Sequence, residues 1–151
     1  MKVWMLAVAL LGLVQCSGCG GSSLPKGETG TVSGNVTFEG KAIPDKSSVI
    51  FMRDEGGITA VGEVDANGEY VLRMRDGLKI LVGVYRVSVV PPNPAANLDQ
   101  DEIMKLHMAN KLPDPAKIKE IPERYRSPEG SKLIYEVNPG PNRYDFDMTS
   151  K

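Results

Sequence analysis

Residues 31–38 read TVSGNVTF, a stretch in which apolar or small residues alternate with polar ones. Successive side chains of an extended chain point to opposite sides, so the apolar and small residues share one face. These are Val32, Gly34, Val36 and Phe38. A period of two over this length is typical of a strand buried on one face only. The stretch therefore predicts one strand of a sheet that covers a hydrophobic core.

The same alternation continues toward the carboxyl terminus, interrupted by turn signals. Asn67-Gly68 separates two alternating runs. Such a pair is a strong hairpin signal, because both residues accept a positive φ. Short strands separated by regularly spaced turns are typical of a β-sandwich. We therefore expect an all-β fold, an antiparallel sandwich of about seven strands, with further strands at residues 48–52, 58–64, 69–74, 79–90, 133–137 and 144–148.

A proline-rich insertion at residues 91–130 interrupts this pattern and carries seven of the eleven prolines. Residues 98–111 are predicted to form a helix with Asn97 as its N-cap, because acidic residues that suit the helix dipole follow at once. We expect residues 121–125 to dock on the sandwich, since their apolar side chains would otherwise be exposed. A long loop in a compact domain is usually functional or mobile, which makes this insertion the best place for a specific function.

The first 30 residues differ from the rest in composition. Residues 1–18 contain one Lys, an apolar run of about a dozen residues and then small residues, the layout of a secretory signal peptide. The run would extend only about 18 Å as a helix, too short for a hydrocarbon core of about 30 Å. Residues 19–30 are rich in Gly and Ser and predict a flexible tether. The domain is expected to span residues 31–149.

The two cysteines lie directly after the apolar run, an arrangement that resembles the lipobox of bacterial lipoproteins. In that motif a cysteine is acylated and becomes the new amino terminus. Cys19 follows Ser17 and Gly18, which fit the motif, whereas Cys16 follows Gln15, which fits poorly. The resemblance implies lipid attachment at Cys19, with Cys16 as the alternative, and a location in the cell envelope on a membrane anchor. An ordinary signal peptide that releases a soluble protein is a further alternative.

Four motifs of the predicted domain resemble a known family. They are VSGNVTFEGKAIP (32–44), VDANGEYVL (64–72), LVGVYRVSVVPP (81–92) and IPERYRSPEGSKLIYEVNPGPNRYDFDM (121–148). Together they are similar to the carboxypeptidase regulatory-like or transthyretin-like β-sandwich found in small bacterial lipoproteins. The resemblance implies a prealbumin-like, Ig-like sandwich that has no catalytic activity, and it does not imply a known ligand.

Composition and charge exclude several functional classes. The 151 residues include 18 Lys or Arg and 19 Asp or Glu, for a formal net charge of −1. This balance leaves no basic footprint for nucleic acid. The chain has a single His, His107, and no G-x-S-x-G turn, so we do not expect an enzyme. No cofactor is expected either.

A metal site is one alternative function. Met104, His107 and Met108 are spaced so that a helix places them on one side, and such soft ligands suit Cu⁺. The competing interpretation is that the two methionines pack the helix against the sandwich. Ca²⁺ is suggested by Asp65 and Glu69 around the hairpin, and by Asp145 and Asp147 on one strand face. The ligand pattern of a calcium loop is absent, however, and a hairpin with a solvated strand face explains these residues without metal.

Glycan binding is the other alternative, and it would need exposed aromatic rings. Trp4 is the only Trp and lies within the signal peptide, and of the Tyr and Phe residues only Tyr125 falls outside the predicted strands. We therefore expect a non-catalytic envelope lipoprotein whose sandwich or insertion contacts an unidentified protein partner. The alternative is an envelope module that binds a glycan or a metal, Ca²⁺ or Cu⁺.

Overall fold

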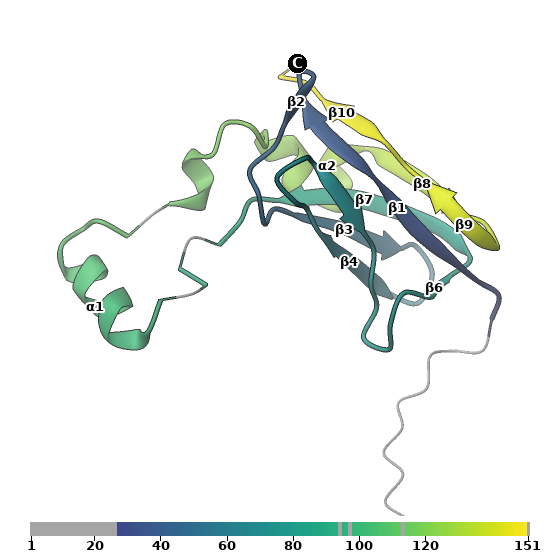
Figure 1. The fold of residues 1–151 in the computed structure, drawn as a ribbon, viewed down its shortest axis with the longest axis horizontal. Helices are drawn as coiled ribbons and strands as arrows, with labels where there is room; N and C mark the ends of the chain where they lie inside the picture. The colour runs from purple at the N-terminus through teal and green to yellow at the C-terminus, as the bar shows by residue number, and fades with distance from the viewer. Residues whose placement is uncertain (1–26, 94, 97, 113, 151) are drawn as a thin grey trace, which may run out of the picture.

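Two β-sheets pack face to face around a hydrophobic core, and a helical segment projects from the sandwich (Figure 1). The computed structural model describes residues 27–93, 95–96, 98–112 and 114–150. The architecture confirms the prediction of an all-β sandwich with a partly helical insertion. In the described part of the chain, no helix is long and apolar enough to cross a membrane.

The first sheet is built around the longest strand, β1 (Thr29–Phe38), with which every other strand of this sheet pairs. Its partners are β2 (Lys41–Ala42), β5 (Glu69–Val71), β6 (Ile80–Leu81), β9 (Gly140–Arg143) and β10 (Phe146–Met148). The second sheet has the order β4-β3-β7-β8 and is antiparallel throughout. Its strands are β3 (Ser48–Arg53), β4 (Thr59–Glu63), β7 (Gly83–Val90) and β8 (Leu133–Val137).

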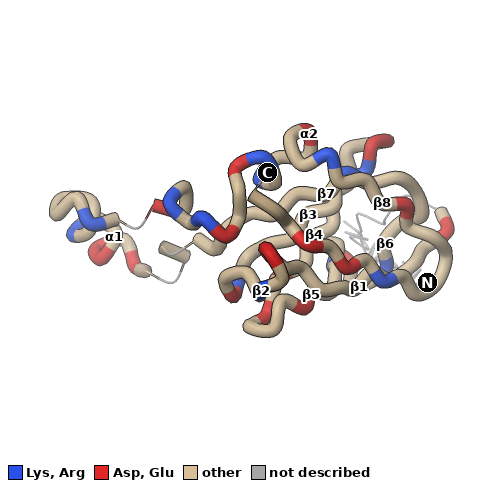
Figure 2. Tube along the Cα trace, turned by 90° about the horizontal axis from the view of Figure 1, so that it is seen from above, with Lys and Arg blue, Asp and Glu red and all other residues tan. Residues whose placement is uncertain are grey.

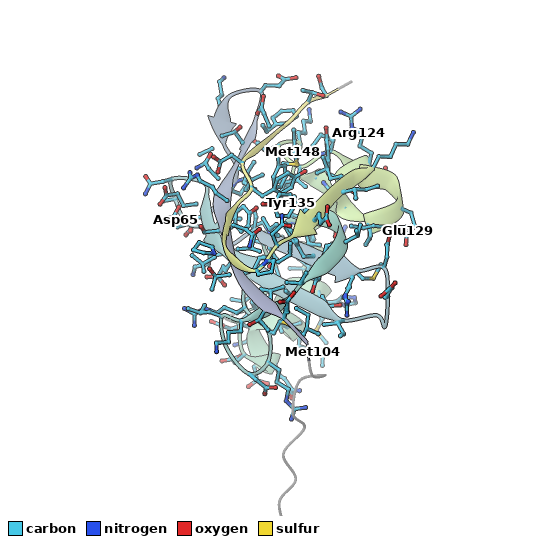
Figure 3. All side chains as sticks on the ribbon, turned by 90° about the vertical axis from the view of Figure 1, so that its right-hand side faces the viewer. Asp65, Met104, Arg124, Glu129, Tyr135 and Met148 are labelled. Atoms are coloured by element: carbon cyan, nitrogen blue, oxygen red, sulfur yellow. The ribbon has the colours of Figure 1, made fainter. Side chains whose placement is uncertain are left out.

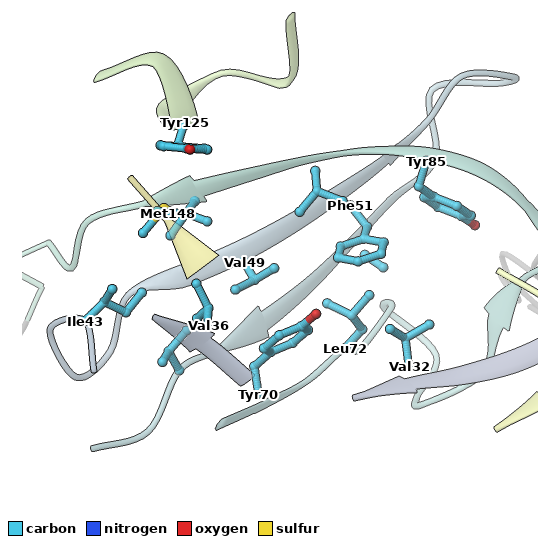
Figure 4. Close-up of a cluster of buried hydrophobic side chains, with 14 of the residues drawn as sticks. Val32, Val36, Ile43, Val49, Phe51, Tyr70, Leu72, Tyr85, Tyr125 and Met148 are labelled. Atoms are coloured by element: carbon cyan, nitrogen blue, oxygen red, sulfur yellow. The ribbon is translucent and has the colours of Figure 1, made fainter. Parts of the chain in front are cut away.

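The alternation seen in the sequence is confirmed on both sheets. Val32 and Val36 of β1 are fully buried, and so are Tyr85, Val87 and Val89 of β7. Figure 4 shows these two layers meeting, with Phe51 of β3 between Tyr85 and Leu72. A core of this kind supplies the main favourable term in folding, because apolar surface leaves water.

The direction of the last two strands differs from the expected antiparallel arrangement. β9 and β10 both run parallel to β1, with Val32 opposite Asn142 and Val36 opposite Phe146. The chain passes from the second sheet to the first between β8 and β9, and β9 lies in the gap between the strands predicted at residues 133–137 and 144–148. Alternation determines which side chains face the core but does not determine the direction in which a strand enters the next sheet.

The predicted strand at residues 79–90 is divided between the two sheets. β6 pairs with β1, whereas β7 pairs with β3 and β8. The change of sheet occurs at Gly83, whose φ of 143° lies in a region that glycine adopts without strain. A single strand over this range was therefore a wrong prediction. Apolar residues continue on both sides of Gly83, because β6 and β7 face the same core.

The hairpin at Asn67-Gly68 is present, but its conformation differs from the expected one. Only Gly68 has a positive φ, 84°, and Asn67 is not among the residues with positive φ. The Asp65 carboxylate instead accepts hydrogen bonds from the backbone N–H groups of Asn67 and Glu69, at 2.8 and 2.9 Å. This side-chain cap stabilises the turn without a left-handed Asn.

The start of the domain also differs from the prediction. Gly30 pairs with Ile80 and with Gly140, and the backbone N–H of Val82 donates to the carbonyl of Glu28 at 2.9 Å. Residues 28–30, predicted as the end of the tether, therefore belong to the sandwich. Gly30 hides the alternation at the start of β1, which is why the sequence placed the boundary too late. Residues 1–26, which include Cys16 and Cys19, lie outside the described residues.

The described residues between 91 and 131 form two helices and two short 3-10 helices: α1 (Gln100–Met108), η1 (Pro115–Lys117), η2 (Glu123–Arg126) and α2 (Pro128–Ser131). α1 is shorter than the helix predicted over residues 98–111. Its N-cap is Asp99, which forms a capping box with Glu102, so the prediction of Asn97 as N-cap was wrong. The reciprocal bonds of Asp99 and Glu102 satisfy two backbone N–H groups, and Asn97 is placed too early to do so.

Candidate functional site

The most distinctive surface feature is an arm, defined here as the described residues between 95 and 120, which carries α1 away from the sandwich (Figure 1). α1 has no buried residue. Its two methionines, Met104 and Met108, are 57% and 79% exposed. A helix of this length is marginal in water unless caps or packing stabilise it. Here the capping box stabilises it, and packing on the sandwich does not.

The arm is fixed to the sandwich by the residues that follow it, 121–126, which are called its base here. Ile121 is fully buried and Tyr125 is 7% exposed, and both belong to the hydrophobic core. Figure 4 shows the Tyr125 ring over Met148 of β10. The prediction that residues 121–125 dock on the sandwich is therefore confirmed.

Arg126 organises the backbone of this base. Its guanidinium donates to four carbonyl oxygens, those of Ile118 at 2.7 Å, Ile121 at 2.9 Å, Pro115 at 3.3 Å and Ala116 at 3.4 Å. Guanidinium is suited to this role because its donors form a rigid planar fork. One side chain thus holds η1 and the following turn against the start of η2.

Arg124 and Tyr125 connect the same base to the carboxyl-terminal end. The Arg124 guanidinium donates to the Tyr125 hydroxyl and to the carbonyl oxygen of Thr149, both at 2.8 Å. Burial raises the pKa of Tyr125, but hydrogen bonds from Thr149 and Arg124 outweigh burial, and the net pKa is lowered. These contacts place the base of the arm beside the end of β10.

The sequence candidates Met104, His107 and Met108 do lie on one side of α1, as their spacing predicts. All three side chains are exposed. The competing prediction, that the methionines pack α1 against the sandwich, was therefore wrong. The connections of α1 are long enough to keep it away from the sheets, and sequence spacing carries no information about that distance.

The carboxylates suggested for Ca²⁺ are engaged in holding strands. Asp147 accepts from the Thr37 hydroxyl at 2.6 Å and from the Gly40 N–H at 3.0 Å, and these bonds lower its pKa. Asp145 forms an ion pair with Arg143 at 2.8 Å, and this partner contributes most to lowering the pKa of Asp145. The described residues contain no group of three or more His, Cys, Asp or Glu arranged to hold a metal ion.

An open hollow of about 480 Å³ lies beside the hairpin and is lined by Glu63, Asp65, Glu69, Tyr70, Val71 and Arg73. Its lining carries three carboxylates and one guanidinium. Two backbone N–H groups already occupy the Asp65 carboxylate and lower its pKa. Along the described trace, Lys and Arg alternate with Asp and Glu in the view of Figure 2. The hollow is therefore an open, solvent-exposed surface lined by charged side chains of both signs.

Three aromatic rings pack on one another and do not form an open platform: Tyr135 of β8, Tyr144 between β9 and β10, and Phe146 of β10. The ring centroids of Tyr135 and Tyr144 are 4.2 Å apart, and those of Tyr144 and Phe146 are 5.3 Å apart with an interplanar angle of 29°. In the view of Figure 3, Tyr135 lies near the centre of the sandwich, between Asp65 on one side and Glu129 on the other. Ring faces that stack on each other are not available to a sugar ring. These described rings are therefore used in packing, as the sequence predicted.

The tyrosine hydroxyls have structural partners as well. The Tyr70 hydroxyl donates to the Tyr144 carbonyl at 2.6 Å, and burial raises the pKa of this phenol above its usual value. A neutral Tyr70 therefore satisfies a backbone carbonyl inside the sandwich.

The sequence reasoning missed the role of Arg126, because all four of its acceptors are backbone carbonyls and leave no residue pattern. Comparison with protein-family models gave no match, and comparison with curated proteins gave no significant match.

Proposed function

We propose that this chain is a non-catalytic lipoprotein of the cell envelope, anchored through a lipid on Cys19, whose β-sandwich presents the arm to a protein partner. The observation that carries the proposal is the exposure of α1. This helix is capped and its base is fixed to the core, yet none of its residues is buried. An ordered segment that buries nothing in its own fold is explained by contact with another molecule, and exposed apolar side chains are typical of such surfaces.

The positions of the tether and the arm support this proposal. β1 begins beside β6 and β9, where the amino-terminal segment leaves the sandwich, and it ends beside β2 and β10. The base of the arm contacts Met148 and Thr149, at the far end of β1. Ten extended residues span about 30 Å. The base of the arm therefore lies about the length of β1 from the point where the described chain begins.

The chemistry of the described residues also supports a non-catalytic role. The single His is exposed on α1, and the carboxylates with lowered pKa are those that hold the hairpin and β10. The two-sheet architecture is compatible with the resemblance to carboxypeptidase regulatory-like or transthyretin-like domains. We propose that the chain belongs to that family, and the proposal rests on the four sequence motifs together with this architecture.

The lipid anchor is tested by comparing Cys19→Ala with Cys16→Ala. The unaltered protein should partition with membranes, and its amino-terminal peptide should carry a diacylglycerol-modified Cys19 by mass spectrometry. We expect Cys19→Ala to remove the lipid and Cys16→Ala to leave it. Loss of the lipid only in Cys16→Ala would assign the anchor to Cys16, and an unmodified soluble protein would refute the anchor.

Contact through the arm is tested by placing a photo-crosslinking residue at position 104 or at position 134. Met104 on α1 and Ile134 on β8 have similar exposure, 57% and 63%. In intact cells we expect a discrete crosslinked species from position 104 and none from position 134. Equal crosslinking at both positions, or none at position 104, would contradict a partner surface on the arm.

A further inference from the structure

We infer that α1 carries a binding site for Cu⁺, formed by the thioether sulfurs of Met104 and Met108 and by the imidazole of His107. The inference is independent of the lipid anchor and of the proposed protein partner. It begins from the geometry of α1, which spans Gln100–Met108 and therefore contains all three residues. Helical neighbours three and four positions apart have Cβ atoms about 5–6 Å from each other. Side chains as long as Met and His can bring their ligand atoms together over that distance.

The three ligand groups are not used elsewhere. Met104 and Met108 are outside the hydrophobic core, and their exposure removes the usual explanation for methionine, which is to fill gaps in packing. Within the described residues, the His107 side chain makes no hydrogen bond or ion pair and is exposed. Coordination of a cation would therefore displace no interaction that stabilises the fold.

The framework of the site is present before a ligand arrives. The capping box of Asp99 and Glu102 fixes the first turn of α1, and Asn110, with a φ of 53°, ends the last turn. Asp101 lies three residues before Met104 and so on the same side of the helix, where its carboxylate adds negative charge near a bound cation. Lys105 lies three residues before Met108 and so also borders this side, where its positive charge offsets that of Asp101.

The ligand set selects the kind of metal. Thioether sulfur is a soft ligand that favours Cu⁺, whereas Ca²⁺ and Mg²⁺ require oxygen ligands. Imidazole also binds Cu²⁺ and Zn²⁺, but a single imidazole supplies only one of the several nitrogen or oxygen ligands that those ions prefer. Two sulfurs and one nitrogen supply a three-coordinate Cu⁺ site.

The test is an anaerobic titration of the full chain with Cu⁺ in competition with a chromophoric Cu⁺ chelator. Cys16→Ser and Cys19→Ser are introduced into every protein, because free thiols would bind Cu⁺ themselves. We expect one Cu⁺ per chain, and we expect Met104→Leu, Met108→Leu or His107→Gln each to weaken binding tenfold or more. Leucine preserves size and helix propensity, so circular dichroism of these variants should be unchanged.

Met74→Leu is the matched control, because Met74 is a half-buried methionine on the sandwich. Its Cu⁺ affinity should equal that of the parent protein. X-ray absorption of the copper-loaded protein should show sulfur and nitrogen neighbours. Failure to retain Cu⁺ against the chelator would overturn the inference. So would unchanged affinity in a Met104→Leu/Met108→Leu double variant, or Zn²⁺ binding that competes equally at this site.

Discussion

Replacing Gly34 by alanine is expected to lower the free energy of unfolding by about 3 kcal/mol or more. A Cβ at this position would lie 2.6 Å from the carbonyl carbon of Tyr144, closer still to its oxygen, and 2.9 Å from the Tyr70 hydroxyl. The atoms in the way belong to a backbone segment between β9 and β10, so no flexible side chain can move aside. The new methyl group would also disturb the hydrogen bond from Tyr70 to Tyr144.

Urea unfolding followed by far-ultraviolet circular dichroism measures this effect. Gly27→Ala is the control, because a Cβ at Gly27 would meet only the movable end of the Leu81 side chain, at 3.2 Å. That variant should unfold within about 0.5 kcal/mol of the unaltered protein. A Gly34→Ala variant as stable as Gly27→Ala would show that the carboxyl-terminal segment does not approach β1 as closely as described.

Arg126→Met is expected to release the base of the arm without unfolding the sandwich. Four carbonyl oxygens would lose their common donor, and methionine preserves much of the apolar stem. Hydrogen bonds to a charged group contribute about 1.5 to 3 kcal/mol each. We therefore expect amide hydrogen exchange over residues 115–121 to become tenfold faster or more, because local opening becomes easier.

Hydrogen-exchange mass spectrometry distinguishes this local opening from unfolding of the whole sandwich. Peptides from β3 and β7 should keep their protection in Arg126→Met. Arg124→Met is the matched control, because Arg124 bonds to Tyr125 and Thr149 and not to the four carbonyls. It should leave exchange over residues 115–121 unchanged. Equal acceleration in both variants would contradict a specific role of Arg126.

Much of the sandwich could be predicted because its strands are buried on one face. In Thr31–Phe38 and Glu69–Met74, each core residue is followed by an exposed or half-exposed one, and burial follows that pattern in the structure. The change of sheet at Gly83 and the parallel direction of β9 could not be predicted. Both depend on how the chain crosses between layers. At Gly83 the flanking residues carry the same apolar pattern as the strands themselves, and between β8 and β9 the turn residues Asn138 and Pro139 do not encode the direction of the next strand.

The candidate site could be predicted only in part. Helical spacing placed Met104, His107 and Met108 on one side of α1, and the structure agrees. The distance of α1 from the sandwich depends on the path of its connections, which residue types do not encode. The Asp99 capping box was overlooked because three acidic residues follow Leu98 in close succession, and only the backbone geometry distinguishes the cap from its neighbours.

The parallel pairing of β1 with β9 and β10 has a consequence for the order in which the domain assembles. β1 is the first strand of the domain to be synthesised, and it gains β9 and β10 as neighbours only when residues 140–148 are present, so the two ends of the domain must meet before the first sheet is complete. Contacts so distant along the chain slow folding, because a large loop must close first. A nascent chain that still lacks residues 140–148 therefore leaves β1 without these partners along one edge until those residues have been synthesised.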